Sequence, residues 1–231
     1  MNPLSRPSVF RPLRRFAGLP GLAALWLLAG CAGLPSLNEP QDTAPAYQPR
    51  NFAGDAALPA TLRRVVLLPV YAGNVASPET AAALDQALLV ALQKQVRFEV
   101  VPLPREQNRL RFGAGEFSSV SALPPGYVAK VAAEAGADAV LFVDLTVYQP
   151  YRPLAVGFRA KLATAAEVRL VWTFDEVISA GDPGVARSAR RQYARADRSG
   201  EPVDLSATVL QSPGRFTAFA AAAMFSTLPP R

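Results

Sequence analysis

The chain has 231 residues and a formal charge of +6, with 50% hydrophobic and 18% charged residues. This composition allows one ordinary domain with additional segments and excludes a disordered polyelectrolyte. The sequence has no histidine and one cysteine. It therefore lacks the most frequent general base and the thiols for an internal disulfide or a thiolate zinc site, and we expect no catalytic centre, no cofactor and no metal.

The first 30 residues predict an export signal. Residues 1–15 carry four arginines and no acidic residue, and residues 16–29 are free of charge and rich in leucine and alanine. A basic start before a short apolar core is typical of a secretory signal peptide, and a transmembrane helix would need about 20 apolar residues. Removal of the four arginines would lower the formal charge from +6 to +2, so nucleic-acid binding loses its main support.

The apolar stretch ends in Leu28-Ala29-Gly30-Cys31, which resembles the bacterial lipobox at all four positions. The resemblance implies that the chain is cut before Cys31 and that fatty acyl chains such as palmitate are attached there, which together hold a protein on a membrane. Ala32, rather than aspartate, follows the cysteine. This implies the outer membrane, facing the periplasm, with the inner membrane as the alternative; a buried cysteine after a hydrophobic helix is the alternative to lipidation.

The rest of the chain divides into a predicted tether and one predicted domain. Residues 31–60 hold five prolines and no periodic apolar pattern, which is typical of a semi-extended linker. A loop packed along the domain is the alternative for the second half of this segment. Residues 61–231 are predicted to form a single globular α/β domain.

Apolar runs and capping signals predict the first elements of this domain. Residues 65–70 predict a buried strand, and Ser77-Pro78-Glu79 predicts the start of a helix whose leucines recur at helical spacing. A short strand is expected at residues 98–101, and residues 103–124 are expected to be irregular. Pro125 is expected to open a second helix, which ends at a glycine C-cap, Gly136.

Strands dominate the second half of the predicted domain. Residues 137–148 are apolar on both faces apart from Asp144 and Thr146, which favours a place in the middle of a sheet. Further strands are expected at residues 155–158 and 168–174, and Ser212-Pro213-Gly214 begins a last helix. Early α/β alternation followed by a meander predicts a mixed sheet of about five strands with about three helices packed against it.

An arginine-rich segment is the most unusual feature of the domain. Residues 187–195 predict a weak strand after a Gly181-Asp182-Pro183-Gly184 turn, and period-two alternation places Arg187, Arg191 and Arg195 in one exposed row. Arginine is suited to bidentate capture of carboxylate or phosphate. The row is therefore a candidate surface for an anionic partner, and a solvated edge strand protected by its charge is the alternative.

Two other groups of residues bear on catalysis. Asp144 in an apolar strand could be a functional carboxylate, or a carboxylate that an arginine or backbone donors satisfy. A Ser–Lys hydrolytic arrangement is compatible with the composition, but none of Lys94, Lys130 and Lys161 lies in an SxxK motif. Neither group favours an enzyme.

The lipobox, the proline-rich tether, residues 64–69 (RVVLLP) and residues 136–141 (GADAVL) together resemble a family of envelope lipoproteins. These have an α/β domain of the curli-secretion, penicillin-binding-protein-activator or Tol-translocation type, and the resemblance covers about residues 63–225. It implies a membrane-anchored, non-enzymatic lipoprotein whose domain binds an envelope protein or an anionic envelope polymer. A subunit of an oligomeric secretion or surface-assembly complex and an enzyme of unknown class remain as alternatives.

Overall fold

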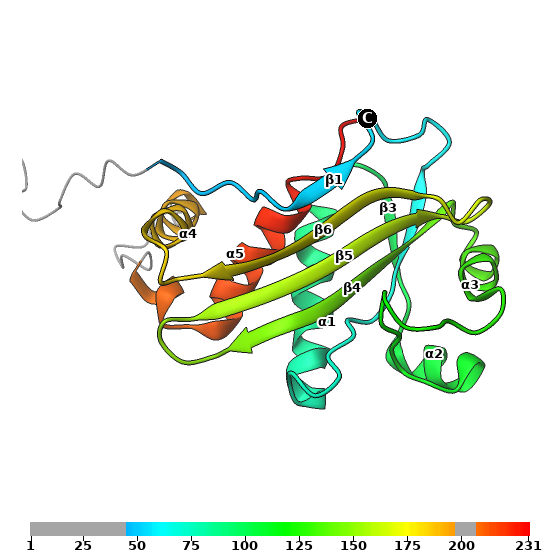
Figure 1. The fold of residues 1–231 in the computed structure, drawn as a ribbon, viewed down its shortest axis with the longest axis horizontal. Coiled ribbons are helices and arrows are strands. Elements are labelled where there is room, and N and C mark those ends of the chain that lie inside the picture. The colour runs from blue at the N-terminus through cyan, green and yellow to red at the C-terminus, as the bar shows by residue number, and fades with distance from the viewer. Residues whose placement is uncertain (1–44, 197–206) are drawn as a thin grey trace, which may run out of the picture. The chain divides into compact units, whose positions relative to one another are not determined.

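The computed structural model describes residues 45–196 and 207–231, and its elements are shown in Figure 1. In chain order these are β1 (Phe52–Gly54), β2 (Arg64–Leu67), α1 (Pro78–Gln93), β3 (Glu99–Pro102), α2 (Arg105–Phe112), α3 (Tyr127–Ala135), β4 (Ala139–Gln149), β5 (Ala155–Thr164), β6 (Leu170–Ser179), α4 (Pro183–Ala196), the 3-10 helix η2 (Ala207–Leu210) and α5 (Pro213–Phe225). The prediction of a mixed α/β fold is confirmed. The described residues form one strand and two α-helices more than the approximate number expected.

The strands form one sheet in the order β1-β6-β5-β4-β2-β3. β2 runs parallel to both of its neighbours, and the other pairs are antiparallel. α1 provides the crossover from β2 to β3, and α2 and α3 provide the crossover from β3 to β4. The predicted central strand is confirmed, because β4 lies between β5 and β2.

Capping residues lie at or near the ends of the helices that the sequence predicts. The Ser77 hydroxyl accepts a hydrogen bond from the Thr80 N–H, and Pro78 occupies the first turn. Leu84, Leu88 and Leu92 of α1 are buried. α5 begins in the same way, with Ser212 as N-cap and proline next to it. α3 ends at Gly136, which is left-handed with φ 59°, but it begins at Tyr127, two residues after the expected start.

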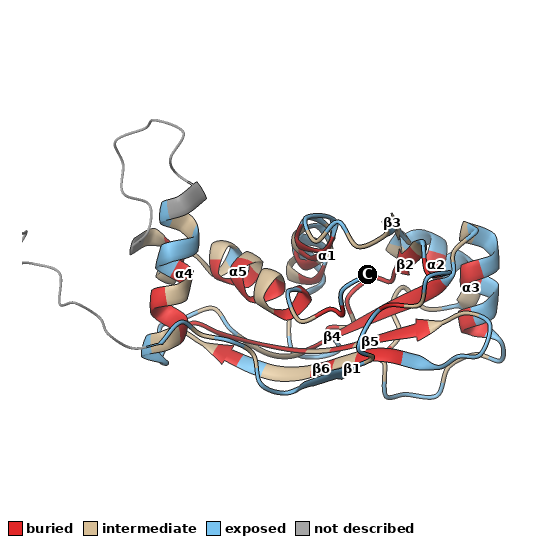
Figure 2. Ribbon diagram, turned by 90° about the horizontal axis from the view of Figure 1, so that it is seen from above, coloured by how far each residue is buried: buried red, intermediate tan, exposed pale blue. Residues whose placement is uncertain are grey.

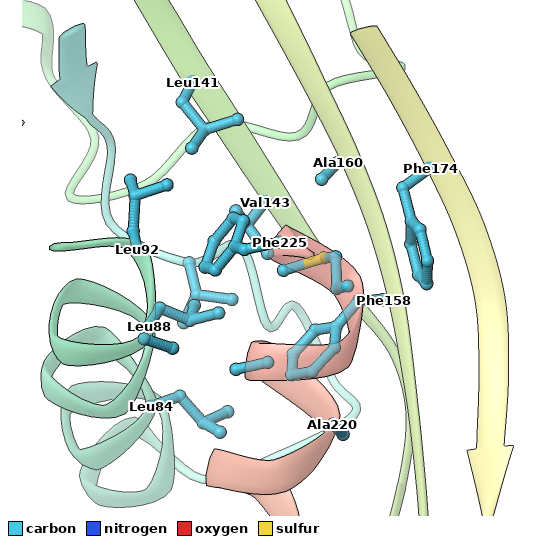
Figure 3. Packing of buried hydrophobic residues seen from close by; sticks show 14 of the residues in the cluster. Leu84, Leu88, Leu92, Leu141, Val143, Phe158, Ala160, Phe174, Ala220 and Phe225 are labelled. Carbon is cyan, nitrogen blue, oxygen red and sulfur yellow. The ribbon is translucent and has the colours of Figure 1, made fainter. Parts of the chain in front are cut away.

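Two hydrophobic clusters lie on opposite faces of the sheet. The larger cluster contains α1, α5, the first turns of α4 and alternate residues of β2, β4, β5 and β6; Figure 2 shows these helices on one side of the strands. Leu88 of α1, Phe225 of α5 and Phe158 of β5 meet at its centre (Figure 3). The smaller cluster joins α3 to the other face of β2 and β4, around the buried ring of Tyr127.

The prediction of a strand at residues 187–195 is wrong, because this segment belongs to helix α4. The sequence between Val185 and Ala196 consists mostly of alanine and arginine and has no further β-branched residue, a composition that favours a helix. The expected turn is in fact the helix cap. The Asp182 carboxylate accepts hydrogen bonds from the N–H groups of Gly184 (2.7 Å) and Val185 (3.2 Å), and Pro183 opens the first turn.

Three further expectations need correction. Residues 103–124 are not irregular throughout, because they contain α2. β5 continues to Thr164, since its charged residues alternate with buried ones instead of ending the strand. The strand expected at residues 168–174 is β6, which begins at Leu170 and continues to Ser179, so Val168 lies before it.

Part of the predicted tether lies against the sheet. β1 pairs with β6, and Leu58 is buried in the larger cluster. The Tyr47 hydroxyl donates to Glu176 of β6 at 2.9 Å. The alternative of a segment packed along the domain therefore describes residues 45–60, whereas residues 31–44, like the lipobox, lie outside the described residues.

Candidate functional site

An ion cluster lies at the carboxyl ends of the parallel strands, where α/β sheets commonly bind ligands. Arg105, at the start of α2, contacts Asp85 of α1 at 2.6 Å, the Val70 carbonyl oxygen at 2.6 Å, and Glu116. The second oxygen of Glu116 accepts the N–H groups of Ala72 (3.1 Å) and Gly73 (3.2 Å). Since each charge has an internal partner, the cluster holds α1, α2 and two loops together and leaves no free group for a ligand.

The electrostatics of this cluster follow from its burial. Burial raises the pKa of Asp85, while hydrogen bonds from Arg105 and from the Val70 N–H act in the opposite direction. Burial lowers the pKa of the Arg105 guanidinium, but its bonds to Asp85 and Glu116 outweigh this and raise it. The sequence analysis missed the cluster because Arg105 lies in the segment expected to be irregular; an acidic residue within the apolar helix α1 was the available signal.

Asp144 is 3% exposed and is fully engaged. Its carboxylate accepts hydrogen bonds from the Ser118 hydroxyl (3.0 Å), the Ser119 N–H (2.9 Å) and the Ser119 hydroxyl (2.9 Å). The expectation that nearby donors satisfy this carboxylate is confirmed, although hydroxyls contribute and no arginine does. Asp144 anchors the loop before α3 to the sheet.

Lysine and serine side chains do not form a nucleophilic pair here. Lys161 of β5 donates to the backbone carbonyl oxygen of Ser119 at 2.9 Å, while the Ser119 hydroxyl donates to Asp144. A general base would have to accept the hydroxyl proton from its nucleophile. The arrangement supports the loop and supplies no Ser–Lys chemistry.

A shallow hollow of about 330 Å³ lies over β5 and β6, on the face opposite α1 and α5. Arg159 and Lys161 line it from β5, and Asp175 lines it from β6. Arg159 forms an ion pair with Asp175 at 2.8 Å. The charged groups of this hollow therefore have protein partners, and their role is to keep an exposed sheet face polar.

Helix α4 carries the arginines that the sequence analysis singled out. Arg187 lies in the first turns and is 5% exposed, so it belongs to the packed side of the helix. Arg190 and Arg191 are exposed, and the side chain of Arg195 lies outside the described residues. Figure 2 shows burial decreasing along α4 away from the sheet. The exposed row is thus not the one expected from a strand.

The exposed side of α4 carries Arg190 and Arg191 together with Gln192 and Ala194. The helix contains four arginines and no acidic residue. Neither Arg190 nor Arg191 forms an ion pair with any described residue. Guanidinium groups on an exposed helix are suited to bidentate contacts with carboxylate or phosphate groups.

In residues 45–196 and 207–231, no helix has both the length and the apolar character that crossing a membrane requires. Within the same residues, no three side chains of histidine, cysteine, aspartate or glutamate gather in a way that could hold a metal ion.

No protein-family model matches this sequence, and no curated protein matches it. Solved structures with a related arrangement include a PelC dodecamer from Paraburkholderia phytofirmans, at 15% identity, 79% coverage of this chain, 97% of that chain and a TM-score of 0.44. Lipoprotein GNA1162 from Neisseria meningitidis is 17% identical over 58% of this chain and 99% of its own, with a TM-score of 0.41. The LpoB C-terminal domain from Salmonella enterica is 13% identical over 51% of this chain and 82% of its own, with a TM-score of 0.35. These likenesses concern the fold alone.

Proposed function

We propose that this chain is a membrane-anchored, non-enzymatic envelope lipoprotein whose α/β domain binds an anionic envelope component. The observation that carries the proposal is Leu28-Ala29-Gly30-Cys31, which follows a basic and then an apolar segment. Cys31 is the residue to which the lipid is attached. Ala32 after the cysteine supports the outer membrane, facing the periplasm.

Helix α4 supports the second part of the proposal. Its exposed Arg190 and Arg191 have no ion-pair partner among the described residues, and the helix adds no negative charge that would neutralise them. Arg195 remains a further candidate on the same helix. A positive surface of this kind attracts acidic partners and accelerates their association.

Lipidation is tested by metabolic labelling with palmitate. Wild-type protein is expected to incorporate the label and to fractionate with membranes, and Cys31→Ser is expected to lose the label and remain unprocessed or be released. Ala32→Asp is the matched variant, because it retains Cys31 and alters only the sorting position. Unchanged labelling of Cys31→Ser would contradict the proposal.

The α4 surface is tested by crosslinking the mature protein in its native envelope. Arg190→Gln combined with Arg191→Gln is expected to weaken partner capture about fivefold, since two exposed charge contacts contribute about 0.5 kcal/mol each. Arg109→Gln combined with Arg111→Gln is the control, because it removes equal charge from arginines already paired with Glu106 and Glu134. Equal loss of partner capture in both variants would point to net charge rather than to α4. Ring-shaped particles in detergent extracts would favour the secretion-complex alternative.

A further inference from the structure

Three arginines line one open hollow at the end of the sheet where β2 and β3 begin. The hollow has a volume of about 390 Å³ and is lined by Arg63, Val96, Arg97, Phe98 and Arg231. Figure 1 shows Arg231, at the end marked C, beside the segment that leads from β1 to β2. The three arginines are thus far apart in the sequence and are brought together by the fold.

The backbone holds Arg231 in place. Its guanidinium donates hydrogen bonds to the carbonyl oxygens of Arg97 and Leu62. The Leu58 N–H donates to the Pro230 carbonyl oxygen at 2.8 Å, so the preceding residue is also fixed. A side chain tied to two segments of the chain is ordered before any ligand arrives, which lowers the entropic cost of binding.

The side chains of Arg63, Arg97 and Arg231 form no ion pair within the described part of the chain. The nearest carboxylates have closer partners. Glu99 pairs with Arg64 at 2.9 Å. Asp138 accepts the backbone N–H groups of Arg63 (2.8 Å) and Arg64 (2.9 Å), which hold the pKa of its carboxyl below the usual value.

The Arg97 side chain lines the hollow. Its Nε atom is buried and has no hydrogen-bond partner among the described residues. This partly buried side chain is therefore held beside the hollow rather than extended into solvent. An anion in the hollow would reduce the repulsion between the three guanidinium groups that line it.

The chemistry of the hollow favours phosphate. Guanidinium groups bind phosphate through pairs of charge-assisted hydrogen bonds, and a phosphate group offers oxygens to more than one arginine. Val96, beside the arginines, is 85% exposed and has a left-handed φ of 53°, which is unfavourable for a β-branched residue. The hollow thus has one exposed apolar side chain beside its arginines, as suits a phosphate that belongs to a lipid headgroup.

We propose that Arg63, Arg97 and Arg231 form a binding site for a phosphate group. The site lies on elements other than α4 and does not depend on the proposed partner surface. A phospholipid headgroup and free inorganic phosphate share this chemistry. Only the phospholipid would also contact the exposed apolar side chain of Val96.

Thermal unfolding of the full chain in detergent micelles tests the site, with circular dichroism as the readout. In one arm inorganic phosphate is added against sodium chloride of equal ionic strength. In the other, phosphatidylglycerol is mixed into the micelles against the same amount of phosphatidylcholine. A ligand that binds only the folded protein raises the melting temperature, and the rise grows with the logarithm of one plus the ratio of ligand concentration to Kd. A rise in the first arm identifies free phosphate, and a rise confined to the second identifies the headgroup.

Arginine variants decide whether the rise comes from this hollow. Arg63→Gln combined with Arg97→Gln is expected to weaken binding at least about tenfold, because two charge-assisted contacts are lost. Arg109→Gln combined with Arg111→Gln removes equal charge from arginines that are paired with Glu106 and Glu134, and it is expected to leave the rise intact. Arg190→Gln combined with Arg191→Gln is measured separately, as a report on α4. If the first variant does not fold, Arg63→Gln alone serves, since this exposed side chain has no hydrogen bond or ion pair in the described structure.

Three results would overturn the proposal. The first is the absence of any rise in both arms. The second is a rise that persists in the Arg63 and Arg97 variants, which would mark a general salt effect on the folded state. The third is a rise lost only in the Arg190 and Arg191 variant, which would place anion binding on α4 and support the proposed function instead.

Discussion

Arg105 is the residue whose environment differs most from what its sequence position suggests. Its side chain is 22% exposed, and the side chains of Asp85 and Glu116 are 29% and 24% exposed. It joins α1, the loop after β2 and the loop before α3. A half-buried charge with this many partners is structurally important because its removal leaves two carboxylates without a cation.

Arg105→Gln is expected to destabilise the protein by about 2–3 kcal/mol, slightly below the cost of breaking a fully buried pair. Urea unfolding monitored by circular dichroism measures this change in the free energy of unfolding. Arg109→Gln is the control on the same helix, because Arg109 and Glu106 are 62% and 66% exposed, and it is expected to cost less than about 0.5 kcal/mol. Equal effects of the two variants would show that the Arg105 cluster contributes no more than an exposed ion pair.

At the level of elements, the sheet edge formed by β1 changes the boundary of the folded domain. The Asp55 N–H donates to the Val171 carbonyl oxygen and the Asp175 N–H to the Asn51 carbonyl oxygen, both at 3.0 Å. These bonds extend the β1–β6 pairing on either side of β1. Without β1, β6 would be the edge strand of the sheet. An exposed edge strand favours association between copies of the chain.

A chain of residues 45–231 is therefore expected to be more stable than one of residues 61–231. Both should fold, but the shorter chain loses β1, the buried Leu58 side chain and the bond from Tyr47 to Glu176. Burial of one leucine contributes about 1.5–3 kcal/mol, so the combined loss should lower the melting temperature by at least about 6 °C. Calorimetry of both chains gives the comparison, and equal melting temperatures would mean that residues 45–60 contribute nothing to the fold.

At the scale of the whole molecule, the two hydrophobic clusters are coupled through shared strands. Val65 and Leu67 of β2 belong to the larger cluster, and Val66 to the smaller one. β4 alternates between the two in the same way. Because each strand contributes to both faces, the loss of one cluster removes the support of the other.

We expect residues 45–231 to unfold in a single cooperative transition. Trp172 is the one tryptophan in this range, is 1% exposed and belongs to the larger cluster, so its fluorescence reports on that side of the sheet. Far-UV circular dichroism also reports on α2 and α3. The two probes should give the same urea midpoint, and an earlier transition in circular dichroism would show that the α3 side unfolds by itself.

The elements that local sequence signals mark could be predicted, whereas contacts between distant residues could not. The starts of α1 and α5, the Gly136 cap and the central position of β4 could be predicted, because a capping hydroxyl, a left-handed glycine and an apolar period act within about one turn or one strand. Helix α4 also had a local signal, the Asp182 cap, but its arginines were interpreted as a charged strand edge.

What the sequence by itself determined is the α/β class; the export signal and the lipobox at Cys31 stay predictions from the sequence. Only the tertiary structure decided that β1 joins β6, that Arg105 contacts Asp85 and Glu116, and that Arg63, Arg97 and Arg231 line one hollow. No local pattern marks these groups, because their members are separated by between 11 and 168 positions. Strand order and helix packing bring them together, and those depend on the burial of the whole apolar surface rather than on neighbouring residues.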